Sequence, residues 1–292
     1  MKEELGKWLD QGIIRKSSSP WASPMVIVHN KDETIRLTVD FRKVNPYIET
    51  DNYPMPLRDA VIEKLHTSKF ISKLDLTKAY LQIPLNEESK KFTSFVVESG
   101  QYEFNMVPFG IKFASGLCNR LIRHILSECD SFVASFVDDL VVYSNSYEEH
   151  LEHLDLVLTK LRESGITLNR KKCSFGNSEV KFLGVVVGNG KVLPDPEKVS
   201  ALKNFPRPVD KKALRSYLGL LSFYRKFIPH LASHTKPLTD LLKKDNPDKI
   251  KWNDDLIKTF DNSRLLMCQE IELSIPKPDE RLSFKLMLPV MA

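Results

Sequence analysis

The sequence predicts an α+β protein in which short strands and helices alternate along most of the chain. Runs of apolar and β-branched residues at 25–28, 35–41 and 70–76 are typical of strands. Residues 148–164 instead repeat leucine at helical spacing, which indicates a long amphipathic helix. The composition then changes, and residues 191–250 are predicted to form a small helical domain.

The other elements follow from local signals of the same kinds. Asp195-Pro196 begins a helix with an acidic cap and proline at the first position. Asp210 caps a second helix, which Pro229 ends. The remaining predictions are, in chain order, a helix at 2–9, a loop with two prolines at 17–24, a helix at 57–65, a hairpin of 92–97 with 102–106, a helix at 114–126, a strand at 180–187 and a helix at 236–244.

The bulk composition is that of a globular protein that works inside a cell. The chain has 292 residues, enough for two domains or one large one, and its apolar runs fall well short of the roughly 18 residues of a membrane span. Its first residues are not a signal peptide. Four widely spaced cysteines indicate reduced thiols and not a disulfide framework.

Positive charge is concentrated in one part of the chain. The net charge is only +5, but residues 160–215 hold thirteen Lys or Arg and five Asp or Glu. A basic stretch of this kind suits a polyanion such as nucleic acid. A solvated helical face is the alternative.

Two histidine pairs have the local spacing of metal ligands. They are His150 with His153 and His230 with His234. No nearby cysteine pair completes a zinc site, so we expect both pairs at exposed positions on helices.

Two adjacent acids, Asp138 and Asp139, interrupt an apolar run at residues 132–142. Both flanks are predicted as short, mostly buried strands, which would place the acids at the tip of a hairpin. Adjacent carboxylates repel each other, and burying their charge against apolar strands is costly. A divalent cation would relieve both problems. The alternative is a solvent-facing turn, although Asp-Asp is not among the preferred two-residue hairpin turns.

A single acid, Asp75, lies between Leu74 and Leu76 in the strand predicted at residues 70–76. An acid in an apolar strand needs a partner, and the sequence offers no obvious basic one. Sharing a metal ion with the Asp138 site would satisfy it.

At this point the motifs resemble a known family. Three of them match reverse transcriptases in order and spacing: Leu74-Asp75-Leu76, Pro108-Phe109-Gly110 and Phe136-Val137-Asp138-Asp139. From about residue 3 to about residue 280, the chain is similar to the pol polyprotein of gypsy-type LTR retrotransposons. The flanking matches are Gly12-Ile13-Ile14-Arg15, Ser19-Pro20-Trp21-Ala22-Ser23-Pro24, Val39-Asp40-Phe41-Arg42, Phe182-Leu183-Gly184, Leu218-Gly219 and Tyr224-Arg225-Lys226-Phe227-Ile228.

The resemblance implies a right-hand polymerase fold and RNA-directed DNA polymerisation. Reverse transcriptase fingers and palm are expected at residues 1–187, a helical thumb at 188–250, and a tether with an incomplete RNase H-like segment at 251–292. The implied partners are an RNA template, a DNA primer, the RNA–DNA hybrid and deoxynucleoside triphosphates, with no membrane. As part of retrotransposon replication, the protein is expected in the cytoplasm, in the virus-like particle of the element.

The same resemblance implies the catalytic residues. In this reaction a primer 3′-hydroxyl attacks the α-phosphate of the incoming nucleotide, and two Mg²⁺ ions roughly 3.5–4 Å apart stabilise the attacking and leaving oxygens. Mn²⁺ can substitute for Mg²⁺ in such sites. Carboxylates are the protein ligands that Mg²⁺ prefers. Asp75 and Asp138 match the two bridging ligands, and Asp139 matches the adjacent, less direct one.

Other roles are implied one position at a time. Tyr80 matches the steric gate whose ring fills the space of a ribose 2′-hydroxyl, with a core tyrosine as the alternative. Lys171 or Lys172 matches a general acid that protonates pyrophosphate. Arg36 matches the fingers arginine that contacts the incoming triphosphate by charge-assisted hydrogen bonds, and Lys31 is expected to serve the phosphates in place of the family's lysine. The nucleotide pocket would also include Phe109, Gly110 and Asn119, and the primer grip Phe182, Leu183 and Gly184.

The chain departs from the family pattern around the nucleotide pocket. Asn30 stands where the family usually has lysine, and Phe136 replaces the more frequent tyrosine before the paired acids. The usual Asn-Ala-Pro after Phe109-Gly110 is here Phe113-Ala114-Ser115, and the usual Phe-Gln is Cys118-Asn119. These changes leave a non-catalytic nucleic-acid-binding remnant as one alternative function.

A two-metal nuclease is another alternative, since it could also use Asp75 and Asp138. The Tyr80 and primer-grip matches argue against it, because a nuclease needs neither a sugar gate nor a primer grip. No Asp or Glu follows Glu280. We therefore expect no RNase H activity from this chain, since that site needs several carboxylates.

Overall fold

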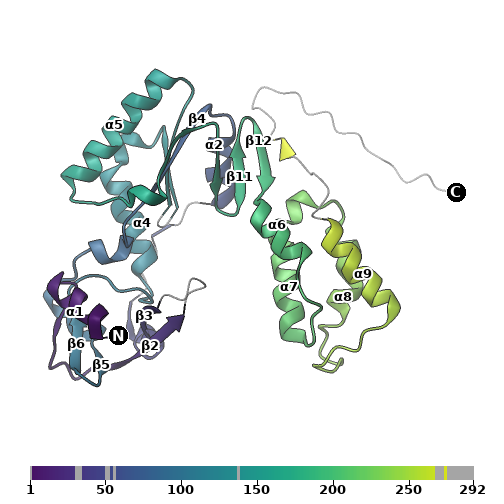
Figure 1. The fold of residues 1–292 in the computed structure, drawn as a ribbon, viewed down its shortest axis with the longest axis horizontal. Helices are drawn as coiled ribbons and strands as arrows, with labels where there is room; N and C mark the ends of the chain where they lie inside the picture. The colour runs from purple at the N-terminus through teal and green to yellow at the C-terminus, as the bar shows by residue number, and fades with distance from the viewer. Residues whose placement is uncertain are drawn as a thin grey trace. The chain divides into compact units, whose positions relative to one another are not determined.

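Three β-sheets carry the part of the fold that the structure describes (Figure 1). Helices accompany each of them, so the predicted α+β class is confirmed. The computed structural model describes residues 2–29, 35–49, 53–54, 57–136, 139–266 and 273–274. The chain divides into two compact units, residues 1–61 with 70–177 and residues 62–69 with 178–292.

The first sheet lies in the first unit and has the strand order β1-β6-β5-β2-β3. Both predicted hairpins are present, β2 with β3 and β5 with β6. Helix α1 (Lys2–Asp10) buries Leu5 and Trp8 against Phe95 and Phe104 of the sheet. The strands are β1 (Ile14–Lys16), β2 (Ser23–His29), β3 (Ile35–Val39), β5 (Phe95–Val97) and β6 (Gly100–Phe104).

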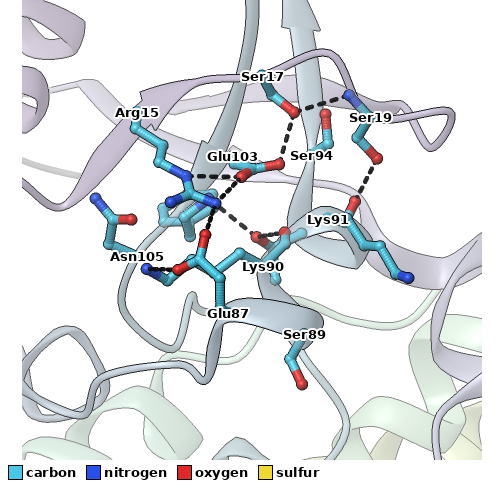
Figure 2. A network of polar contacts seen from close by, with 12 residues as sticks. Arg15, Ser17, Ser19, Glu87, Ser89, Lys90, Lys91, Ser94, Glu103 and Asn105 are labelled. Atoms are coloured by element: carbon cyan, nitrogen blue, oxygen red, sulfur yellow. Dashed lines mark hydrogen bonds and ion pairs between the residues drawn. The ribbon is translucent and has the colours of Figure 1, made fainter.

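A polar network ties the edge strand β1 to β6 and to the short helix α3 (Glu87–Lys90). Figure 2 shows Arg15 between the carboxylates of Glu87 and Glu103. Glu103 is buried, and Arg15 Nε and Ser17 Oγ donate to it at 2.8 and 2.6 Å. Hydrogen bonds from Lys90 and Arg15 hold the pKa of Glu87 below its usual value. The buried carboxylate of Glu103 is therefore hydrogen-bonded, which offsets the cost of burying its charge.

The second sheet of this unit has the order β7-β8-β4-β9, and helices α4 and α5 cover one face of it. Leu74 of β4 and Leu140 of β8 pack against the covered face, while the adjacent residues Asp75 and Asp139 alternate to the other face. The elements are β4 (Phe70–Asp75), β7 (Val133–Phe136), β8 (Asp139–Ser144), β9 (Ser174–Asn177), α4 (Ala114–Ile125) and α5 (Tyr147–Glu163).

The strand β9 was not foreseen from the sequence. Its residues, Ser174–Asn177, have no apolar alternation and include a glycine with φ of +61°. They pair with β4 across a register shift between Ile71 and Lys73. Pairing with a strongly apolar neighbour, and not local propensity, makes this segment a strand.

The expectation that His150 lies on an exposed helix surface is wrong. His150 is 1% exposed, and its Nε2 and Nδ1 lie 2.7 Å from Ser72 Oγ and 2.9 Å from Ser144 Oγ. The ring of His153 is stacked on Phe132 with centroids 3.7 Å apart. His150 and His153 lie on α5, which follows β8 and its last residue Ser144, and both face the sheet. Polar contacts of His150 and His153 with serines of the sheet join the helix to it.

Among its described residues, the second unit combines a sheet of order β10-β11-β12-β13 with helices α6 to α9. Tyr217 of α7 is fully buried. Its ring is tilted against that of Phe260 with centroids 4.8 Å apart, and its hydroxyl oxygen lies 2.6 Å from Ser263 Oγ of α9. The elements are β10 (Glu179–Phe182), β11 (Val185–Gly188), β12 (Lys191–Pro194), β13 (Leu273–Ser274), α6 (Pro196–Lys203), α7 (Lys211–Phe223), α8 (Leu231–Asp240) and α9 (Asp254–Leu265).

Several boundaries in this unit differ from those expected. The predicted helical segment at 191–250 begins with a strand, β12, because the preceding Asn189-Gly190 turns the chain back on β11. Helix α8 ends at Asp240 and not at residue 244. Within the segment expected as a tether, Asp254–Leu265 forms helix α9, which packs against α6 and α8. Most of the chain beyond residue 266, where the incomplete RNase H-like segment was expected, lies outside the described residues.

The short elements complete the described chain. Within it, no helix is both long and apolar enough to cross a membrane. Cys118, Cys129 and Cys173 are free thiols. The remaining helix is α2 (Arg58–His66), and the short 3₁₀ helices are Phe41–Lys43, Asn45–Tyr47, Ala79–Gln82, Lys91–Thr93, Ser127–Cys129, Arg170–Lys172 and Arg225–Phe227.

Buried His150 should make the protein less stable below neutral pH. Burial first, and the neighbouring His153 second, lower the pKa of His150 below 6.5, while Glu149 opposes this shift. The unfolded chain therefore binds a proton at a higher pH than the folded chain does. The free energy of unfolding should fall as the pH drops through about 6.5 and level off below the folded-state pKa.

Urea unfolding at several pH values between 5 and 8 measures this dependence. The variant His150→Gln should be less stable at pH 8 but should lose less stability on acidification than the wild type does. His124, which is exposed on α4, supplies the control variant His124→Gln. If all three proteins lose the same free energy on acidification, His150 is not the group responsible.

Candidate active site

The register of two antiparallel strands places two of the predicted acids directly opposite each other. Asp75 is the last residue of β4, Asp139 is the first residue of β8, and the two are Cα partners. Because side chains alternate along a strand, both carboxylates point away from the face covered by α4 and α5. Asp138 lies outside the described residues. The structure therefore brings together two of the three acids and leaves the third undescribed.

A lysine, which the sequence reading missed, lies beside these acids. Lys73 Nζ is 2.8 Å from Asp139 Oδ1, and the side chains are 25% and 32% exposed. Lys73 precedes Asp75 by two residues, so it lies on the same face and reaches diagonally across to β8. The two-residue spacing within a strand was the signal that could have revealed it.

The donor chemistry of this face fits a divalent cation. Carboxylate oxygens from two adjacent strands are the ligands that Mg²⁺ takes in proteins. A lysine ammonium already associates with Asp139, which shows that a positive charge is accommodated there. Among the described residues, no group of three or more metal-ligating side chains is assembled, since Asp138 is not among them.

A cavity of about 490 Å³ opens beside Asp75 and lies within the first unit. Phe109 and Lys172 line it, so residues from three predicted roles share one cavity. The end of β4 is fixed there, because Asn169 N donates to Asp75 O at 2.8 Å and Asp75 N donates to Cys173 Sγ at 3.4 Å. This backbone anchoring limits how far the carboxylate can shift.

The predicted sugar gate packs against the turn before α4. The Tyr80 ring meets Phe109 edge-on, with centroids 5.2 Å apart. Its hydroxyl oxygen is 3.0 Å from Ser115 Oγ, one of the positions where the chain departs from the family pattern. Gly110, at φ of +92°, follows Phe109 and turns the chain towards α4. The Tyr80 side chain thus contacts Phe109 through its ring and Ser115 through its hydroxyl.

The two substituted positions further along α4 face inward. Cys118 and Asn119 are buried. Asn119 Nδ2 donates to Pro54 O at 3.4 Å, and its Oδ1 has no hydrogen-bond partner among the described residues. An orphaned buried acceptor costs free energy until something donates to it. Asn119 therefore retains the capacity to accept one hydrogen bond, consistent with its predicted place in a nucleotide pocket.

The predicted primer grip is a tight turn in the second unit. Phe182 ends β10 and pairs with Val185, so Leu183 and Gly184 form a two-residue hairpin turn with φ of +49° and +78°. Positive φ at both positions matches the turn that suits the twist of a hairpin, although leucine adopts it only at some cost. Tyr224 Oη donates to Gly184 O at 2.8 Å and holds the turn to the end of α7.

The structure describes the side chains of only some of the basic residues predicted to contact the nucleotide. Lys171 and Lys172 are exposed on the 3₁₀ helix Arg170–Lys172. Arg36 lies on β3, but its side chain and all of Lys31 are outside the described residues.

Some Lys residues of the basic stretch at 160–215 make contacts within the second unit. Lys211 is buried, and its Nζ donates to Lys243 O and Asn246 O, both at 2.6 Å. Lys181 pairs with Glu197 at 2.6 Å. Fewer basic side chains of residues 160–215 are therefore available to bind a polyanion than the sequence count indicates.

Comparisons with known proteins agree on one family. The model of the family described as "Reverse transcriptase (RNA-dependent DNA polymerase)" matches residues 28–187. The chain is 34% identical to the retrovirus-related Pol polyprotein from transposon 297 of Drosophila melanogaster, over 94% of the chain and 26% of that polyprotein. It is 33% identical to the one from transposon gypsy, over 98% of the chain and 29% of that polyprotein. The chain thus spans under a third of the length of these relatives.

Solved structures show the same fold. The foamy viral protease-reverse transcriptase in complex with double-stranded DNA superposes with a TM-score of 0.86 at 25% identity, over 91% of this chain and 47% of that one. The same viral enzyme with an RNA/DNA hybrid gives a TM-score of 0.86 at 24% identity, over 94% and 37%. The right-hand polymerase fold expected from the sequence is confirmed.

Removing the hydroxyl that holds the hairpin turn should loosen it. We expect Tyr224→Phe to lower the free energy of unfolding by about 1 kcal/mol, the usual worth of one hydrogen bond. Tyr47→Phe is the control, because Tyr47 is 77% exposed. Gly184→Ala should cost more, since its Cβ would lie 3.1 Å from the Phe223 ring at a φ that disfavours side chains. Denaturant unfolding measures all three, and equal stability of Tyr224→Phe and wild type would contradict the anchoring.

Proposed function

The chain belongs to the reverse transcriptase family, and from this premise we propose that it extends a DNA primer on an RNA or DNA template. The observation that carries the proposal is the direct opposition of Asp75 and Asp139 on β4 and β8. The substrates are deoxynucleoside triphosphates, and the context is replication of a retrotransposon. Its similarity to Pol polyproteins of such elements supports this context and a place in their virus-like particles.

Asp75, Asp138 and Asp139 are the proposed ligands of two Mg²⁺ or Mn²⁺ ions. When bound, these ions would activate the primer hydroxyl and neutralise charge on the leaving pyrophosphate. The anchored end of β4 keeps the Asp75 carboxylate in place on the strand. Lys73, which associates with Asp139, offsets the repulsion between the acids when no cation is present.

The cavity beside Asp75 is the proposed nucleotide site. Phe109 lines it, and Tyr80 packs edge-on against that ring, which suits a gate against a ribose 2′-hydroxyl. Lys172 also lines the cavity, so its ammonium can supply a proton to the leaving pyrophosphate. Arg36 on β3, together with Lys31, Gly110 and Asn119, completes the proposed contacts to the nucleotide.

The parts of a right-hand polymerase follow from this assignment. We assign fingers and palm to residues 1–187, the thumb to 188–250 and a tether to 251–292. The rigid turn at Leu183 and Gly184 is the proposed primer grip, because a fixed backbone turn can hold the primer end against small displacements. The RNA template, DNA primer and their hybrid are the proposed nucleic-acid partners.

Extension of a labelled DNA primer on an RNA template tests the proposal. The wild-type chain should add deoxynucleotides in Mg²⁺. Asp75→Asn and Asp139→Asn should each lower the rate more than about a hundredfold, since even outer partners of metal ligands are worth 10–100-fold. Asp130→Asn, at an exposed position outside the site, is the control and should remain active.

Circular dichroism and unfolding should show that each Asn variant keeps its fold, because removing one acid relieves repulsion in the absence of metal. Extension at the wild-type rate by either variant would contradict the assignment of the carboxylates. Hybrid binding without extension by the wild type would instead support the non-catalytic alternative, and metal-dependent cleavage would support the nuclease.

A further inference from the structure

The Tyr80 side chain has a specific polar contact at its far end. Tyr80 lies on the 3₁₀ helix Ala79–Gln82, which follows β4, whereas Ser115 lies in the first turn of α4. The two hydroxyl oxygens are 3.0 Å apart. A gap of 35 residues separates them in the sequence, so the fold, and not local geometry, brings them together.

The contact supplements a packing interaction that restrains the ring only partly. Tyr80 meets Phe109 edge-on with centroids 5.2 Å apart. An edge-on contact favours one orientation of the Tyr80 ring, but the energetic cost of tilting its hydroxyl end stays small. A hydrogen bond at the hydroxyl restrains that far edge, so the two contacts together define the position of the whole ring.

Ser115 can supply this bond because of a departure from the family pattern. The family usually has proline at this position, and proline has no side-chain donor or acceptor. Both residues suit the first turn of a helix, so the exchange leaves the helix start intact. What the exchange adds is a hydroxyl within reach of Tyr80.

We propose that Ser115 is a positioning residue that sharpens discrimination against ribonucleotides by holding the Tyr80 ring in place. The inference rests on the proposed function, in which Tyr80 is the sugar gate. A ring held both by its edge-on contact with Phe109 and by its hydroxyl leaves no room for a ribose 2′-hydroxyl. A ring released at the hydroxyl can tilt and admit it. Deoxynucleotides need no such space, so their use depends little on the bond.

A double-mutant cycle on nucleotide selectivity tests this inference. The measured quantity is the ratio of kcat/KM for a deoxynucleotide to that for the matching ribonucleotide. Ser115→Ala and Tyr80→Phe should each lower it by about two- to tenfold, the effect of one lost hydrogen bond. The double variant should lose no more than either single variant, because both remove the same bond. The fall should come mainly from a lower KM for the ribonucleotide.

Two further variants separate positioning from a general loss of stability. Ser115→Pro should behave as Ser115→Ala does. Tyr143→Phe removes a different tyrosine hydrogen bond, from β8 to Ser131 O at 3.0 Å, and should leave selectivity unchanged. Wild-type selectivity in Ser115→Ala, or effects that multiply in the double variant, would overturn the inference.

Failure of the proposed function is distinguishable from failure of this inference. A wild-type chain that incorporates no deoxynucleotide would overturn both. Normal incorporation with selectivity that is insensitive to Ser115 would overturn the positioning role alone.

Discussion

The pairing register of β4 with β8 is the constraint on which the candidate site depends. It sets Asp75 opposite Asp139 and turns both away from the face covered by helices. A slip of one residue would exchange the acids with their buried neighbours Leu74 and Leu140. Those leucines are 0% and 1% exposed, so the cost of such a slip is the burial of charge and the exposure of core side chains. The hydrophobic core therefore fixes the chemistry on the opposite face.

Charge balance on that face depends on one lysine. Two acids on adjacent strands repel each other, and this repulsion opposes the same register that the core enforces. Lys73 reduces the conflict by associating with Asp139 at 2.8 Å. A divalent cation would act on the same carboxylate, so the site can be neutralised in two ways. Lys73 therefore offsets part of the charge on this face when no cation is bound.

Local patterns predicted the strands and acids well, because apolar runs and alternation are properties of neighbouring residues. The hairpin carrying Asp139, the strand carrying Asp75 and the caps of α6 and α7 followed from such patterns. Contacts between distant segments could not be predicted in this way. The pair Tyr80 and Ser115, the burial of His150 and the strand β9 all depend on which elements the fold places together. Lys211 belongs to the basic stretch at residues 160–215, yet it is buried and donates to the carbonyls of Lys243 and Asn246.

Anomalous diffraction from Mn²⁺ is the most direct test of the account. Crystals of the chain with a primer, a template and Mn²⁺ should show anomalous density between the carboxylates of Asp75 and Asp139. The same density should weaken or vanish in crystals of Asp139→Asn. Mn²⁺ bound elsewhere, with none between these two carboxylates in crystals that hold the primer–template, would contradict the assignment of this face as the catalytic site.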